Sequence, residues 1–139
     1  MLINKSIIDR LKQLVIEHDE KLAPAVTFPE ALYDYDFGRK IGKAPYRFWQ
    51  QYKDFVEHID GINIDGCRIY SIENHFSYKN DLFTFNGFLT NIANETPSIM
   101  IEDDLYCIEF GASSLDTYTY DVRTHKWESR DRQQYQNLF

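Results

Sequence analysis

The spacing of apolar residues changes along the chain, and this change constrains the fold more than any other feature of the sequence. Residues 3–22 and 45–59 carry apolar side chains at the three- and four-residue intervals that are typical of amphipathic helices. After residue 66, short segments rich in β-branched and aromatic residues alternate with turn residues, as strands do. Two helices followed by a run of strands predict an α+β fold with an antiparallel or mixed β-sheet flanked by helices.

The second helical segment is the main candidate for the core. Pro45 fits the first turn of a helix, and Asp60-Gly61 fits its end, because glycine readily adopts the left-handed conformation found there. The apolar stripe between them consists of Phe48, Trp49, Tyr52, Phe55, Val56 and Ile59. We expect this stripe to be buried and not to bind a ligand. The first helix is expected to end near Glu20.

The second half of the chain predicts several strands and one clear hairpin. Strands are predicted over residues 67–72, 98–101, 105–110, 117–121 and 126–130. The last two form a hairpin that turns at residues 123–125, with Tyr118 and Tyr120 on one face and Trp127 buried. Residues 74–97 are ambiguous, because Gly87 and the phenylalanine and threonine content weaken a helix over residues 82–92. Residues 23–44 predict a connector with little regular structure, which either wraps the surface or carries function.

Composition predicts one folded domain over residues 1–139. Apolar residues make up 43% of the chain and aromatic residues 16%, which is enough for one continuous core. Cys67 and Cys107 lie far apart and outside metal-ligand patterns, so we expect two buried free thiols. The N-terminal residues resemble no signal peptide, and no apolar run approaches the length of a membrane span. A cytoplasmic location is expected.

The net charge of the chain restricts the kinds of molecule that it is expected to bind. The formal net charge is −7, which disfavours nucleic acids and anionic membranes and favours a basic protein. Between Lys79 and Arg123 the sequence has eight acidic residues and no lysine or arginine. This acidic interval has two interpretations, a solvated surface that keeps the protein soluble or a docking face.

Motifs for catalysis are missing from the sequence. No two of the four histidines are three or four residues apart, and no phosphate-binding loop or nucleophile elbow is present. The pairs Asp34/Asp36 and Asp103/Asp104 are suited to a divalent cation or to acid–base chemistry, although solvated acidic pairs are common in loops. We therefore expect no enzymatic activity, no cofactor and no metal.

The acidic residues are instead candidates for partner binding. Tyr33 and Tyr35 alternate with Asp34 and Asp36, and tyrosine is favoured at interfaces. The candidate contacts are Asp34, Asp36, Asp81, Glu102, Asp103, Asp104 and Asp116.

The order and spacing of several motifs resemble the SUKH superfamily of Smi1/Knr4-like domains, over most of the chain. The matching pieces are Pro45-x-x-Phe48, Ile59-Asp60-Gly61, Gly66-Cys67-Arg68-Ile69-Tyr70, Ile108-Glu109-Phe110-Gly111, Asp116-Thr117-Tyr118-Thr119-Tyr120-Asp121 and Lys126-Trp127-Glu128 before Arg130-Asp131. Two departures are Asp60-Gly61, where the family usually has Asn-Gly, and residues 112–115, where many members are glycine-rich.

The resemblance implies a sheet flanked by helices, no catalysis, and binding to another protein. Bacterial members of the superfamily are mostly immunity proteins that bind and neutralise polymorphic toxins such as nucleases or deaminases. The expected partner is therefore a basic toxin domain. The alternative is a regulatory or scaffolding domain unrelated to toxins, as in eukaryotic relatives. The oligomeric state is left open.

Overall fold

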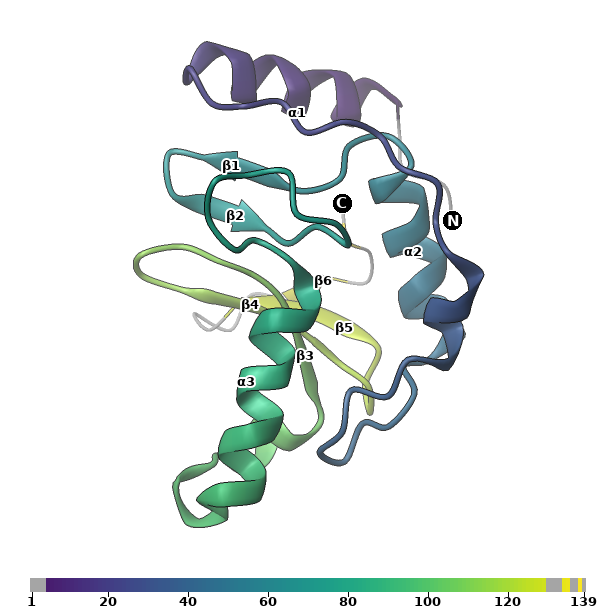
Figure 1. The fold of residues 1–139 in the computed structure, drawn as a ribbon, viewed down its shortest axis with the longest axis vertical. Coiled ribbons are helices and arrows are strands. Elements are labelled where there is room, and N and C mark those ends of the chain that lie inside the picture. The colour runs from purple at the N-terminus through teal and green to yellow at the C-terminus, as the bar shows by residue number, and fades with distance from the viewer. Residues whose placement is uncertain (1–4, 130–133, 136–137, 139) are drawn as a thin grey trace.

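The computed structural model describes residues 5–129, 134–135 and 138, and within them six strands follow one another in chain order as one antiparallel sheet (Figure 1). The strands are β1 (Ile62–Ile64), β2 (Cys67–Ile69), β3 (Cys107–Ala112), β4 (Thr117–Asp121), β5 (Lys126–Ser129) and β6 (Gln134–Tyr135). The helices are α1 (Lys5–Glu17), α2 (Tyr46–Val56) and α3 (Leu82–Glu95), with short 3₁₀ turns η1 (Glu30–Asp34), η2 (Pro97–Ile99) and η3 (Glu102–Leu105). The predicted α+β fold with an antiparallel sheet is confirmed.

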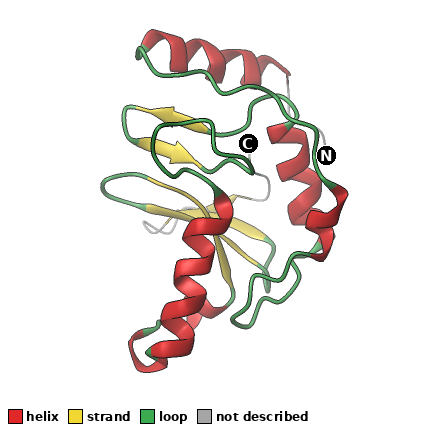
Figure 2. Ribbon diagram, viewed as in Figure 1, coloured by secondary structure: helices red, strands yellow, loops and turns green. Residues whose placement is uncertain are grey.

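The three helices lie at different places around the sheet. In Figure 1, α1 is at the upper end of the molecule, α2 stands at the right side, and α3 runs from the centre to the lower end. The loop that leaves α1 runs along α2 (Figure 2), where Val26 N donates a hydrogen bond to Val56 O. Phe28 and Phe37 of this connector are buried against the core, so the connector wraps α2. In the described part of the chain, no helix has the length and apolar character needed to cross a membrane.

The aromatic stripe of α2 forms the centre of the core, as the sequence predicts. Each of its apolar members, Phe48, Trp49, Tyr52, Phe55 and Val56, has 0% exposure. The helix ends before Asp60-Gly61, and Gly61 has φ +98°. A Cβ atom on Gly61 would lie 2.8 Å from the Ser71 Cβ atom, so both the backbone conformation and the close approach require glycine.

The predicted hairpin at the end of the chain is confirmed as β4 and β5. Tyr120 pairs with Trp127 across the ladder, and both are 1% exposed. Their rings lie 4.7 Å apart, and Trp127 also stacks on Phe48 of α2 at 5.5 Å. The hairpin therefore closes the core against α2. Arg130, the last residue of the predicted strand, lies outside the described residues.

Three local predictions need correction, and the structure assigns one segment that the sequence left ambiguous. The first helix ends at Glu17, three residues earlier than expected, because Asp19 takes a left-handed conformation with φ 55°. The predicted strand over residues 98–101 is wrong, since η2 covers its first two residues and Ile101 is exposed. The ambiguous segment over residues 82–92 belongs to a helix, α3. Cys107 is buried as expected, but Cys67 is exposed because it follows the Asp65-Gly66 turn at the outer end of the β1–β2 hairpin.

The first half of β3 lacks a strand neighbour on the β2 side, and side chains take its place. Strand β2 pairs with β3 only at Gly111 and Ala112. The amide of Asn86 in α3 both donates to Glu109 O at 2.8 Å and accepts from Glu109 N at 3.0 Å, as a neighbouring strand would. Arg39 donates to Cys107 O at 2.8 Å. These contacts close an open sheet edge and fix α3 beside β3.

Candidate functional site

The centre of the acidic interval is a surface turn between α3 and β3. Its carboxylates are consecutive in η3, with Glu102 and Asp103 exposed and Asp104 half-buried. Ile101, directly before them, is 58% exposed. The structure thus brings together three of the predicted partner contacts beside an exposed apolar side chain.

Bases from other segments lie next to this turn. Arg123 donates to Asp103 at 3.0 Å and to Asp121 at 2.9 Å, and its guanidinium lies 4.2 Å from the centre of the Tyr106 ring. Lys40 Nζ lies 5.7 Å from the centre of the same ring, and Arg39 donates to Asp104 O at 3.1 Å. The charge pattern of the sequence therefore overstates how acidic this surface is.

The pKa values of the Arg123 cluster follow from these contacts. Burial alone would raise the pKa of Asp121, but hydrogen bonds from the side chain and backbone of Arg123 bring it below its ordinary value. The same carboxylates of Asp121 and Asp103 raise the pKa of Arg123. Asp121 is 5% exposed and is committed to the turn that follows β4. Asp103, in contrast, is exposed, and its surface ion pair leaves it able to meet a partner.

Asp81 is buried, so its expected role as an exposed contact is contradicted. It is 7% exposed and caps the N-terminus of α3, where it accepts hydrogen bonds from Thr84 N at 2.9 Å and Thr84 Oγ1 at 2.7 Å. Burial works to raise the pKa of Asp81, but the hydrogen bonds from Thr84 lower it below its ordinary value. A helix cap satisfies backbone N–H groups that would otherwise lack partners.

Asp116 lies far from η3. It belongs to the turn between β3 and β4, where its carboxylate accepts from Thr117 N at 2.8 Å. The β3–β4 ladder runs from the Cys107–Asp121 pair near η3 to the Ala112–Thr117 pair near Asp116. This separates Asp116 from η3 by about 17 Å of strand, so one docking face does not gather all the predicted acids.

Asp34 and Asp36 lie in the connector. Asp34 forms an exposed ion pair with Lys43 at 3.2 Å, and Asp36 accepts from Gly38 N at 2.8 Å in a local turn. The turn touches η3, since Lys40 N donates to Leu105 O at 3.0 Å. The connector therefore brings Arg39 and Lys40 next to η3, whereas Asp34 and Asp36 make local contacts within the connector.

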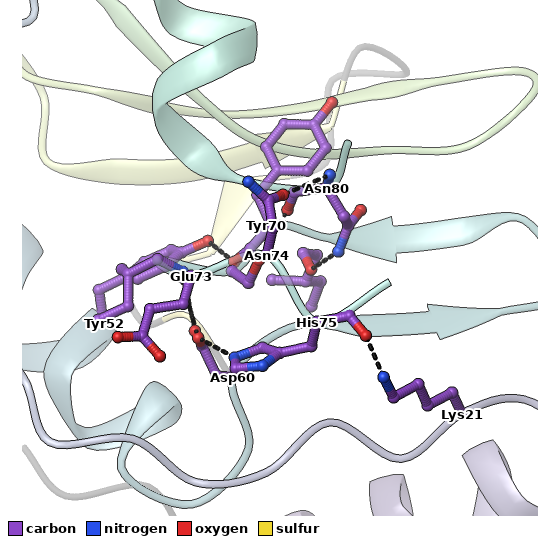
Figure 3. A network of polar contacts seen from close by, with 11 residues as sticks. Lys21, Tyr52, Asp60, Tyr70, Glu73, Asn74, His75 and Asn80 are labelled. Carbon is purple, nitrogen blue, oxygen red and sulfur yellow. Dashed lines mark hydrogen bonds and ion pairs between the residues drawn. The ribbon is translucent and has the colours of Figure 1, made fainter. Parts of the chain in front are cut away.

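A buried carboxylate–imidazole pair is a polar feature that the sequence did not predict (Figure 3). Asp60 is 0% exposed and accepts from His75 Nε2 at 2.7 Å, Ile72 N at 2.8 Å and Glu73 N at 3.1 Å. Burial raises the pKa of Asp60, against the effect of these hydrogen bonds. The Asp60-Gly61 helix-end signal marked the position, but nothing in the spacing linked it to a histidine 15 residues later.

The contacts of this pair indicate a structural role. Both carboxylate oxygens of Asp60 bind backbone N–H groups of the segment after β2, and Lys21 donates to His75 O from the connector. In residues 5–129, no serine, threonine or cysteine side chain is hydrogen-bonded to His75. A catalytic dyad needs a nucleophile or a water path at the imidazole. The pair instead ties three separate segments together.

Among the residues that the structure describes, two groups of side chains have the spacing of metal ligands. The ligand atoms of Asp60, Glu73 and His75 lie within 4.8 Å of one another, as do those of Cys107, Asp121 and Glu128. In the first group, a cation would displace the hydrogen bond between His75 and Asp60. In the second, burial raises the pKa of the Cys107 thiol to about 12, and Asp121 is held by Arg123. Neither group is prepared for a metal, and the absence of a metal or cofactor stays a prediction.

Comparison with protein-family models, curated proteins and solved structures finds no match to this chain. The resemblance to the SUKH superfamily therefore stays a prediction, and the function has to be argued from the surface itself.

Proposed function

We propose that this chain is a non-catalytic domain that binds a basic protein, and that it serves as an immunity protein against a toxin domain of the nuclease or deaminase type. The observation that carries the proposal is the surface turn at η3. There, Glu102 and Asp103 are exposed and stand next to the exposed side chain of Ile101. Carboxylates beside an apolar side chain suit a partner that presents lysine or arginine around an apolar contact.

A basic toxin domain is the favoured partner on electrostatic grounds. Domains that act on nucleic acids present basic clefts for phosphates, and an acidic protein can occupy such a cleft in their place. The net charge of −7 adds long-range attraction, which speeds the encounter at low ionic strength. The motif order that resembles the SUKH superfamily supports the same class of function.

The internal use of the ionisable groups supports a non-catalytic role. Asp60, Asp81 and Asp121 are buried and hold backbone N–H groups or Arg123 in place. These carboxylates are committed to the fold, and moving a proton through them would disturb the contacts that position them.

The proposal is tested by growth rescue. Basic proteins encoded beside this chain are expressed in a bacterial host with and without it, and we expect one of them to arrest growth unless this chain is present. Calorimetry on the purified pair should give one-to-one binding that weakens as salt is raised from 50 to 300 mM. The partner's nuclease or deaminase activity should be lost in the complex.

Charge reversal supplies a matched control. Glu102→Lys/Asp103→Lys should slow association, whereas Asp9→Lys/Glu17→Lys changes the charge equally on α1, at the other end of the molecule (Figure 1). Equal effects of the two pairs would refute specific docking at η3. Binding to a basic protein that is not toxic would refute the immunity role and favour the scaffolding alternative.

A further inference from the structure

Helix α3 is unusual in having no charged residue before its last position. From Leu82 to Asn94 the helix has no aspartate, glutamate, lysine or arginine, and Glu95 is its first charge. Seven of its residues are apolar, yet the buried positions of the helix are only Leu82 and Asn86. A helix on a protein surface normally presents charged residues to water. The exposed positions of α3 before Glu95 are Thr84, Phe88, Asn91 and Asn94, so its outer side is uncharged and carries one exposed aromatic side chain where a solvated helix would be charged.

The two halves of α3 differ in what they touch. In the first half, Phe83 packs on Tyr35 at 4.6 Å and Phe85 stacks on Tyr70 at 4.4 Å. Farther along the helix, the Thr90 hydroxyl donates to Phe37 O at 2.6 Å. Beyond that point the helix continues to the lower end of the molecule (Figure 1).

One side of this second half is exposed. Phe88 is 63% exposed, Asn91 is exposed, and Ile92 is half-buried, and these residues follow one another at helical spacing. The chain then turns through η2 to Ile101 and η3, and Arg39 joins η3 to α3 by donating to Asp104 O at 3.1 Å and to Asn86 Oδ1 at 2.9 Å. We define the α3 patch as Phe88, Asn91, Ile92 and Ile101.

Exposed acids follow the residues of the α3 patch along the chain. Glu95 is exposed at the end of the helix, and Glu102 and Asp103 are exposed in η3. An apolar centre with a charged border is the usual composition of a docking surface, with aromatic residues as anchors. A second copy of this chain would bring the same acids against themselves, so charge argues against a homodimer at this patch.

We infer that the α3 patch is the surface on which the basic partner docks, with Phe88 as its apolar anchor and Glu95, Glu102 and Asp103 as its electrostatic border. The inference rests on the proposed function and specifies its partner, a protein segment that presents apolar side chains flanked by lysine or arginine.

The first test uses a synthetic amphipathic helix of leucine and lysine as the probe. NMR titration of the labelled chain at low salt should shift the backbone amides of residues 88–95 and 101–103. Phe88→Ser should weaken binding of the peptide at least about tenfold, as expected for an aromatic anchor. Ile101→Ser provides a second variant of the same patch.

The matched control is Tyr46→Ser. Tyr46 is 62% exposed, comparable with Phe88, but lies at the start of α2. Its substitution should leave peptide binding unchanged. Shifts confined to other surfaces, or equal effects of the Phe88 and Tyr46 variants, would overturn the inference. Circular dichroism should show that the Phe88 and Ile101 variants melt as the wild type does, since both side chains are exposed, and that Tyr46→Ser loses only the stability of its ring contact with Tyr33.

The growth assay separates this inference from the proposed function. If the toxin is neutralised equally by wild type and by Phe88→Ser, the docking face is wrong and the function stands. If the peptide binds at the α3 patch but no basic protein is neutralised, the function is wrong and the face stands. Sedimentation should show a monomer, and a dimer that dissociates with Phe88→Ser would assign the patch to a second copy and overturn the basic partner.

Discussion

Replacing Asn86 by alanine should destabilise the protein more than its position on a partly exposed helix suggests. Asn86 is 1% exposed and makes four hydrogen bonds. Two of them join its amide to Glu109 N and O, one accepts from Arg39 at 2.9 Å, and one donates to Leu82 O at 2.7 Å. The side chain thus supplies both bonds that a strand would supply at Glu109.

The expected cost follows from the groups that lose their partners. Alanine leaves the N–H and C=O of Glu109 without hydrogen bonds, at about 1–2 kcal/mol each for groups that are partly buried. Arg39 keeps its bonds to Cys107 O and Asp104 O, and Leu82 O remains an acceptor within the helix. Alanine also gains about 0.5 kcal/mol in helix propensity over asparagine. The free energy of unfolding should therefore fall by about 2–3 kcal/mol.

Urea unfolding followed by circular dichroism measures this loss. With an m-value of roughly 1–3 kcal/mol/M, the midpoint should fall by about 1–2 M. Asn91→Ala is the matched control, because Asn91 is exposed on the same helix and should gain only the propensity term. If the two variants differ by less than about 0.5 kcal/mol, the edge-closing role of Asn86 is refuted.

Asn86→Asp tests the contribution of the Asn86 side-chain NH₂ group, which donates to Leu82 O and Glu109 O. The substitution keeps the two acceptor contacts but places a carboxylate oxygen against the carbonyl oxygens of Glu109 and Leu82. Protonation of the carboxyl group restores a donor. The variant should therefore be less destabilised at pH 4 than at pH 7, each measured against Asn86→Ala at the same pH.

Three further predictions follow from the buried groups. Trp127→Ala should lower the free energy of unfolding by about 3–5 kcal/mol in urea melts, because Trp127 is 1% exposed against Phe48 and Tyr120; a loss below 1 kcal/mol would contradict this packing. One thiol per chain, that of Cys67, should react with a thiol reagent at pH 8, and Cys107 should react only after unfolding, because it is buried and its pKa is raised to about 12. Asp81→Ala should cost about 1 kcal/mol at pH 7. The folded state lowers the pKa of Asp81, so the ionised carboxylate stabilises the protein fully above the ordinary pKa of 3.8. This stabilisation is lost as the pH falls through the lower pKa of the folded state. In acid titrations, the stabilities of wild type and variant should therefore converge at low pH.

The sequence predicted best where apolar spacing alone decides the structure. The stripe of α2 and the β4–β5 hairpin could be predicted because their side chains must face one core. The segment over residues 82–92 was ambiguous because the apolar composition of α3 suits a strand as well as a helix. Its structure is decided by the Asp81 cap and by the contact of Asn86 with β3, and long-range contacts of this kind leave no periodic signal.

For the candidate site, counting charged residues in the sequence was a limited guide for the same reason. Counting residues predicted an acidic interval, and the exposed carboxylates of η3 belong to it. The count could not predict that Arg39 and Lys40 would pack against η3 from more than 60 residues away, or that Asp81 would be buried as a helix cap. Nor did it indicate the Asp60–His75 pair, whose members are joined by the path of the chain after β2.

Burial separates two sets of side chains whose substitution should have different consequences for function. Asp60, Asn86 and Asp121 complete backbone hydrogen bonds, so substituting them should reduce stability and binding together. Phe88 and Glu102 are exposed, so substituting them should reduce binding without changing stability. A docking surface at α3 requires that binding can be lost without a loss of stability. The reason is that a residue that contacts only a partner contributes little to the folded state of the free protein. If Phe88 variants lost stability in proportion to binding, the apolar side of α3 would be part of the core and would offer no surface to a partner.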